Sequence, residues 1–249
     1  MKIVLQRRID RIAGTIICRI LSLFQLRSGR GIGYSPPHKI LVILLSEMGS
    51  LVLARPMFVS LRKSYPEAKI YALVFERNRE CLEMLGVIPS KNIFSVDGNS
   101  MATLLRDSIR SLLRIRKEKV DTVLDGELFS RISSIYSFLS GAKIRVGFHP
   151  HTQEGLYRGS FINRPVLYNP YLHISHQFVN LVEALRGGSF PIVKRKINDG
   201  IPDVPVLDLD REEVDALKGR LKSDFPEIAG KKLVLLYPSG GLLPIRAWP

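Results

Sequence analysis

The stretch KILVILL, residues 39–45, constrains the fold of this chain more than any other feature. A dense apolar run that is too short to cross a membrane is typical of a strand buried on both faces, as in a parallel sheet. Ser-Glu-Met-Gly-Ser follows it directly, and a new apolar pattern then begins. This order predicts a tight turn into a helix, whose first N–H groups point toward whatever lies above the strand end.

Strands and helices alternate after this first strand, which predicts a doubly wound, Rossmann-like α/β domain. We expect further strands over residues 69–75, 92–97, 121–125 and 144–148, and helices over residues 51–66, 78–86, 101–118 and 128–139. Residues 149–173 contain turn residues throughout and are predicted to form a long loop, and residues 173–186 a helix.

The C-terminal part of the sequence indicates a change of domain. Residues 187–210 are rich in Pro and Gly, as an interdomain linker is, and a helix opened by an Asp cap follows. KKLVLLYPSGG, residues 231–241, predicts another strand and turn. We therefore expect three parts: a basic amphipathic helix and linker (1–38), a Rossmann-like domain (39–200), and a linker helix with the start of a second such domain (201–249).

The net charge of +14 favours anionic partners, and half of the excess lies at the start of the chain. Residues 1–39 hold eight Lys and Arg residues against one acid, Asp10. No nucleic-acid-binding motif accompanies the charge, so nucleic acid is not an expected partner. Cys18 and Cys81 lie far apart without CxxC spacing, which argues against a disulfide scaffold or a zinc site and suits a reducing compartment.

Two segments carry patterns with two interpretations each. Apolar residues at spacings of three and four predict an amphipathic helix over residues 9–24, and Arg19 interrupts it, so it is not a membrane span. This helix either packs on the domain or lies in the interface of an anionic bilayer. Four cations share one face of the helix over 101–118 and form either a solvated face or a contact with lipid headgroups: Arg106, Arg110, Arg114 and Lys117.

Four stretches in this order resemble glycosyltransferase family 9, the bacterial heptosyltransferases of lipopolysaccharide synthesis. They are the opening strand, turn and helix (40–74), a strand-helix-SGA-strand segment ending in Arg-x-Gly-Phe (120–148), the helix after the acceptor loop (173–185), and a small-residue turn followed by Arg-x-Trp-Pro (233–249).

The resemblance implies a GT-B arrangement, in which one Rossmann-like domain holds the acceptor and a second holds the nucleotide sugar. It implies inverting transfer from a nucleotide diphosphate donor to an anionic glycolipid acceptor, with no metal or other cofactor, at the cytoplasmic side of the inner membrane. By this likeness the chain holds the acceptor domain and only the start of the donor domain, and we expect it to be inactive alone. The alternative is a truncated, non-catalytic acceptor-binding or membrane-associated module. An NAD-type oxidoreductase is disfavoured because no GxGxxG follows the first strand.

The resemblance also points to site residues, with two departures from the family pattern. The family's likely general base, an Asp directly after the Gly of the first turn, is here Ser50. Glu47 is the nearest carboxylate and is our candidate base, although it also suits a helix start that merely complements the dipole. Asp125, at the end of another predicted strand, is the next candidate. Gly49 is predicted to permit the tight turn and to border the acceptor.

Donor and acceptor groups complete the expected site. Ser239, Gly240 and Gly241 follow a predicted strand and would offer N–H groups to the donor phosphates. Arg246 stands where the family has a Lys and keeps the positive charge with another geometry. Two arginines that flank the long loop are expected to meet acidic groups of the acceptor: Arg145 and Arg158. The pairs His149/His151 and His173/His176 lack Cys or acidic companions, so no metal site is expected.

Overall fold

A computed structural model describes residues 8–26, 36–45, 47–128, 130–148, 157–186 and 209–236 of the chain. The chain divides into two compact units, residues 1–206 and residues 207–249. His149 and His151 lie outside the described residues, as do the residues predicted to bind the donor phosphates: Ser239, Gly240, Gly241 and Arg246.

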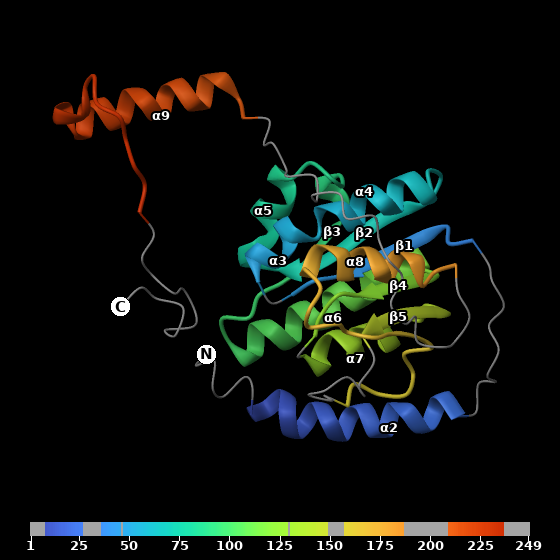
Figure 1. Ribbon diagram of the computed structural model, residues 1–249. Coiled ribbons are helices and arrows are strands. Elements are labelled where there is room, and N and C mark those ends of the chain that lie inside the picture. Colours follow the sequence, from blue (N-terminus) through green and yellow to red (C-terminus); the bar gives the residue numbers. More distant parts are fainter. Residues whose placement is uncertain are drawn as a thin grey trace. The chain divides into compact units, whose positions relative to one another are not determined.

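A parallel sheet forms the centre of the first unit (Figure 1). In the described residues its order is β3-β2-β1-β4-β5-β6, and every neighbouring pair is parallel. The strands are β1 (Lys39–Ile43), β2 (Lys69–Phe75), β3 (Ile93–Val96), β4 (Thr122–Asp125), β5 (Ile144–Phe148) and β6 (Arg164–Val166). The predicted Rossmann-like α/β fold is confirmed.

Helices cover both faces of the sheet because its strands are apolar on both sides. Ile40 and Val42 of β1 face one core, and Leu41 and Ile43 face the other. The first core is covered by α3 (Met48–Leu53), α4 (Arg55–Ser64), α5 (Arg79–Met84) and α8 (Ile174–Glu183). The second is covered by α6 (Met101–Glu118) and α7 (Arg131–Leu139).

The first predicted helix is broken into α3 and α4 at Ala54. Pro56 explains the break, because proline has no N–H to donate and is tolerated only in the first turn of a helix. It occupies that turn of α4. The effect is to separate a short helix beside the end of β1 from the longer helix that packs on the sheet.

The loop predicted over residues 149–173 is corrected in part, because it contains β6. Val146, Gly147 and Phe148 of β5 pair with Arg164, Pro165 and Val166. Pro165 within a three-residue strand obscures the strand pattern, since proline removes one ladder donor and is tolerated mainly at sheet edges. β6 is such an edge in the described residues.

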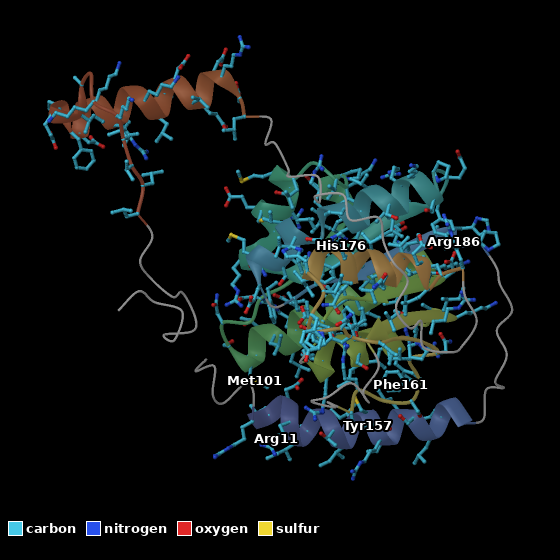
Figure 2. The ribbon with its side chains drawn as sticks, in the orientation of Figure 1. Arg11, Met101, Tyr157, Phe161, His176 and Arg186 are labelled. Atoms are coloured by element: carbon cyan, nitrogen blue, oxygen red, sulfur yellow. The ribbon has the colours of Figure 1, made fainter. Side chains whose placement is uncertain are left out.

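A further helical layer lies outside α7. The predicted N-terminal helix forms as a π-helical turn, η1 (Asp10–Gly14), that continues into α2 (Thr15–Leu26). Cys18 of α2 packs into a small third core with Phe161 and Ile162. Figure 2 shows Tyr157 and Phe161 between α2 and the rest of this unit.

The second unit contains α9 (Arg211–Asp224) and a short 3-10 turn, η4 (Pro226–Ile228). The side chain of Asp210 caps α9 by accepting from the N–H of Glu212 at 3.0 Å, as the sequence predicts. Residues 231–236, where a strand is predicted, form no strand ladder and are exposed. A strand is stabilised by pairing, and these residues have no neighbouring strand among the described residues.

Candidate functional site at the carboxyl ends of β1 and β4

The strand order places a topological switch point between β1 and β4. The chain runs outward from β1 to β2 and β3, and then returns to β4 on the other side of β1. In open parallel sheets of this kind, ligands bind outside the carboxyl ends of the two strands where the direction reverses. Ile43 pairs with Asp125 at that end, so the segments that follow β1 and β4 begin side by side.

Buried side chains hold the segment after β1 from both sides. The N–H of Leu45 donates to Oε1 of Glu127 at 2.6 Å, and the carbonyl of Leu45 accepts from Nδ2 of Asn78 at 2.9 Å. Glu127 follows β4 and Asn78 follows β2, and both are buried. The N–H and carbonyl of Leu45 are therefore held by side chains that follow the two neighbouring strands. These bonds fix the position of the backbone shortly before Glu47.

A buried ion pair organises the segment after β4. Nη2 of Arg158 contacts Oδ2 of Asp125, and both residues are almost fully excluded from solvent. The Oγ of Ser133 donates to the same carboxylate oxygen at 3.2 Å, and the N–H of Glu127 donates to Oδ1 at 3.1 Å. Burial raises the pKa of the Asp125 carboxyl, while the Arg158 guanidinium and these hydrogen bonds oppose the rise.

Arg158 also ties the loop before β6 to the start of α7. Its guanidinium donates to the carbonyls of Glu127 and Ser130, the latter at 3.0 Å. Both oxygens of Asp125 are thus engaged within the fold, and so is its cation. Asp125 therefore has a structural role, because it fixes the backbone of the segment after β4. Its carboxylate is buried and cannot reach a reacting group, so Asp125 is a poor alternative base.

Glu47 lies on the solvent side of this network. It is the N-cap residue of α3, with an extended backbone, and its side chain is exposed and makes no capping hydrogen bond to the helix. Ser50 stands three residues later in the first turn of α3, and its N–H donates to the carbonyl of Glu47 at 3.1 Å. The turn thus presents a carboxylate near the switch point, with Ser50 half-buried behind it.

The role predicted for Gly49 in the turn is not required by its conformation. Gly49 lies in α3 and is not among the described glycines with a positive φ, and a Cβ there would meet no heavy atom within 4 Å. Gly126 is the glycine that is tightly packed at this edge. A Cβ at Gly126 would lie 2.7 Å from Cδ2 of Leu44, so a side chain there would force Leu44 or the segment after β4 to shift.

The two arginines predicted to bind the acceptor are both buried. Arg145 donates from Nε to the carbonyl of Phe161 at 2.7 Å and from Nη1 to the carbonyl of Ala142. Burial lowers the pKa of Arg145 to about 10, which leaves it charged at neutral pH. Arg145 thus connects β5 to the loop before β6, Arg158 connects that loop to β4, and contact of either residue with an acceptor stays a prediction. His173 caps α8 by accepting from the N–H of Ser175.

Two open surface hollows lie away from these residues. One, of about 770 Å³, is bordered by α4 and residues 85–89, and the other, of about 560 Å³, by the amino ends of β4 and β5. Neither is lined by Glu47, Asp125 or Glu127. We place the candidate site by the strand order and the carboxylates, because the switch point is where sheets of this topology bind ligands.

Solved structures of glycosyltransferases have the same fold as this chain. A family 9 glycosyltransferase from Veillonella parvula matches with a TM-score of 0.54 at 17% identity, over 79% of this chain and 51% of that one. The ADP-heptose LPS heptosyltransferase II of E. coli matches with a TM-score of 0.54 at 15% identity, over 74% and 50%. The E. coli heptosyltransferase WaaC, solved with ADP-2-deoxy-2-fluoro heptose, matches with a TM-score of 0.51 at 15% identity, over 61% and 49%.

These likenesses establish a fold shared with part of each transferase. The chain spans about half the length of the solved structures that it matches. No protein-family profile and no curated protein sequence matches it.

Sequence reasoning missed three residues that build this edge of the sheet: Asn78, Glu127 and Ser133. The sequence did contain an indication of Glu127, since it stands two residues after Asp125, which ends a predicted strand. Asn78 and Ser133 gave none, because each acts through side-chain hydrogen bonds that only the folded chain brings together.

Proposed function

We propose that the Rossmann-like domain predicted over residues 39–200 is the acceptor-side domain of a family 9 glycosyltransferase. The reaction moves a heptose or related sugar from a nucleotide diphosphate donor to a lipopolysaccharide or related glycolipid acceptor, with inversion at the anomeric carbon. The observation that carries the proposal is the parallel sheet with its switch point between β1 and β4, in the fold of two heptosyltransferases and a third family 9 structure. The ordered motifs of the sequence support the same family.

In this proposal Glu47 accepts the proton of the attacking acceptor hydroxyl. It is the exposed carboxylate after β1, whereas Asp125 and Glu127 are buried and serve as hydrogen-bond acceptors within the fold. A hydroxyl is a much weaker base than a carboxylate, so Ser50 does not take over the role of the Asp that the family has at this position. Closure over the bound sugar would exclude water around Glu47 and make it a stronger base.

Partners and location follow from the same proposal. The donor is a nucleotide sugar, as the WaaC structure with an ADP-heptose analogue illustrates for that protein. Binding of its phosphates is assigned to Ser239, Gly240, Gly241 and Arg246. The acceptor is an anionic glycolipid, and we place the protein on the cytoplasmic face of the inner membrane. No helix among the described residues combines the length and low charge needed to cross a bilayer.

The alternative to transfer is an acceptor-binding or membrane-associated module without catalysis of its own. The two functions share acceptor binding and differ in transfer, which makes them separable.

The first test measures both properties on the 249-residue chain. Binding of a lipopolysaccharide core oligosaccharide is measured by calorimetry, and transfer is measured with a panel of nucleotide diphosphate heptoses and hexoses. We expect acceptor binding without transfer from the chain alone. Transfer would show that the chain suffices as an enzyme, and absence of acceptor binding would contradict both functions.

The second test addresses the base, in an assembly with the donor half of a family 9 enzyme. Glu47→Gln should lower kcat by about 10²–10⁴-fold, the usual value of a positioned base, and leave acceptor affinity nearly unchanged. Ser50→Ala should change kcat much less. Glu67→Gln, an exposed carboxylate before β2, is the matched control. Normal turnover by Glu47→Gln would move the base elsewhere.

A further inference from the structure

The N-terminal helix packs on the rest of the domain with its side of small and polar residues, which a surface helix usually exposes to solvent. Its buried residues are small or polar and recur one turn apart: Gly14, Cys18 and Ser22. Most of its large apolar residues are exposed instead, with Leu23 at 63% and Ile12 and Phe24 at 58%, whereas Leu21 is partly buried against the third core. The others on this outer face are Ile16, Ile17 and Ile20. The amphipathic pattern is therefore present, with the apolar side turned away from the core.

Specific contacts fix this orientation of the helix. The carboxylate of Asp10 accepts from the N–H groups of Arg131 and Ile132 at 2.9 and 3.1 Å, and so caps α7 from another element. The Oγ of Ser22 accepts from the N–H of Ser160 at 3.0 Å. A Cβ at Gly14 would lie 2.9 Å from Cβ of Arg131, so the close approach requires glycine. Rotation that buried the isoleucines would break these contacts.

Cations border the outer apolar face. Arg8, Arg11 and Arg19 are exposed on the same helical stretch, and its one acid, Asp10, is turned inward to α7. An apolar strip with arginines beside it is the composition of a helix that lies in the plane of an anionic membrane surface.

α6 carries a second strip of the same kind on the same side of the sheet. Its exposed apolar residues recur every four positions: Met101, Leu105, Ile109 and Leu113. Exposed cations follow in a parallel row: Arg106, Arg110, Arg114 and Lys117. α6 and α7 cover the same core, Nε of Arg116 on α6 donates to the carbonyl of Leu139 on α7 at 2.7 Å, and α2 packs on α7 (Figure 1).

We propose that the outer face of the N-terminal helix, together with the exposed strip of α6, is a docking surface for an anionic lipid bilayer. Ile12, Ile16, Ile20 and Phe24 enter the acyl boundary, and the arginines of both helices meet phosphate headgroups. The apolar residues supply affinity, and the cations select anionic lipid.

Charge distinguishes a bilayer from a second copy of the chain as the occupant. A symmetric contact between two copies would bring the arginines of one against those of the other, which disfavours association. A polyanion without acyl chains, such as a nucleic acid, would satisfy the arginines and leave the isoleucines in water. Only an anionic surface with an apolar interior matches both kinds of residue.

The experiment is co-sedimentation of the full 249-residue chain with vesicles. Vesicles of phosphatidylcholine with phosphatidylglycerol are compared with vesicles of phosphatidylcholine alone, at low and high salt. We expect binding to the anionic vesicles that weakens as salt rises. Readout by sedimentation keeps this inference separate from the proposed function, since neither donor nor transfer is involved.

Two variants separate the apolar and the charged contributions. Ile16→Gln with Ile20→Gln should weaken vesicle binding by roughly tenfold or more, because two half-exposed isoleucines can no longer be buried in the bilayer. Arg110→Gln should weaken it about fivefold on anionic vesicles alone, the effect of one cation near the surface. Val59→Gln, at an exposed apolar position of α4 on the opposite face of the sheet, is the matched control and should bind as the unchanged chain does.

Circular dichroism must show that each variant keeps its fold. Equal vesicle binding by the Ile16→Gln/Ile20→Gln variant and the unchanged chain would overturn the proposal. So would an oligomer in light scattering that this variant abolishes while neither protein binds vesicles, because the face would then be a protein interface.

Discussion

The segment after β4 and the outer face of the N-terminal helix break the usual pattern of burial in opposite directions. After β4, charged groups are buried: Asp125 and Arg158 are almost fully excluded from water and form an ion pair. On α2, isoleucines are exposed while small and polar residues face the core. One region places charge where apolar side chains belong, and the other places apolar side chains where charge belongs.

The two regions differ in where the interaction partners of these side chains come from. The buried charges find every partner inside the fold, since backbone N–H groups, carbonyls and a hydroxyl surround the ion pair. A buried pair is tolerated when its remaining hydrogen-bonding capacity is satisfied in this way. The exposed isoleucines have no such internal partner. Only contact with an external apolar medium would remove their apolar surface from water and so give a favourable free energy. The first region should therefore control stability, and the second association.

Loss of the buried cation should have the largest effect on stability. Arg158→Met leaves Asp125 buried without its partner, and removing one member of a buried pair typically costs about 3–5 kcal/mol. Urea denaturation followed by circular dichroism measures the change. Arg186→Met, which removes an exposed cation paired with Glu183, should cost less than about 1 kcal/mol. Equal effects of the two variants would show that the buried pair is not special.

A methyl group on Gly126 should have the next effect. Gly126→Ala brings a Cβ against the buried side chain of Leu44, and such overpacking typically costs about 1–3 kcal/mol. Gly49→Ala is the matched control, because its Cβ meets open space within a helix and should be neutral or slightly stabilising. The pair of unfolding curves decides which glycine the turn region requires.

Removal of the cap that the N-terminal helix gives to α7 should cost less. Asp10→Ala loses the bonds to the N–H groups of Arg131 and Ile132, and the loss of a cap is typically worth about 1 kcal/mol. Thermal unfolding checks this value, with Glu67→Ala as an exposed control. An unchanged midpoint would mean that the helix contributes nothing to the stability of α7.

The smallest effect on stability is expected on the outer face of α2. Ile20→Gln should change the free energy of unfolding by no more than about 0.5 kcal/mol, because its side chain is half exposed. Urea denaturation of the lipid-free protein measures it. A loss comparable to that of Gly126→Ala would place this face inside a protein contact and end the comparison with the buried pair.

Long periodic segments were predictable from the sequence because local pattern decides them. The helix expected over residues 101–118 has those bounds in the structure, and the strand over 69–75 likewise. β6 was missed because three residues around a proline carry too little pattern, and only pairing with β5 makes them a strand. The helix after β1 was predicted to start at residue 51 and starts at Met48, so Glu47 is its N-cap and Ser50 lies within its first turn.

Apolar spacing is a local property of the sequence, and it was enough to predict the strands β1 to β5 and the amphipathic pattern of residues 9–24. The tertiary structure alone decided which way that pattern faces and which charges are buried. Asp10 caps a helix more than a hundred residues away, and Arg158 pairs with Asp125 although α7 and β5 lie between them in the chain. Such contacts follow from how the chain closes on itself, and no spacing between neighbouring residues encodes them.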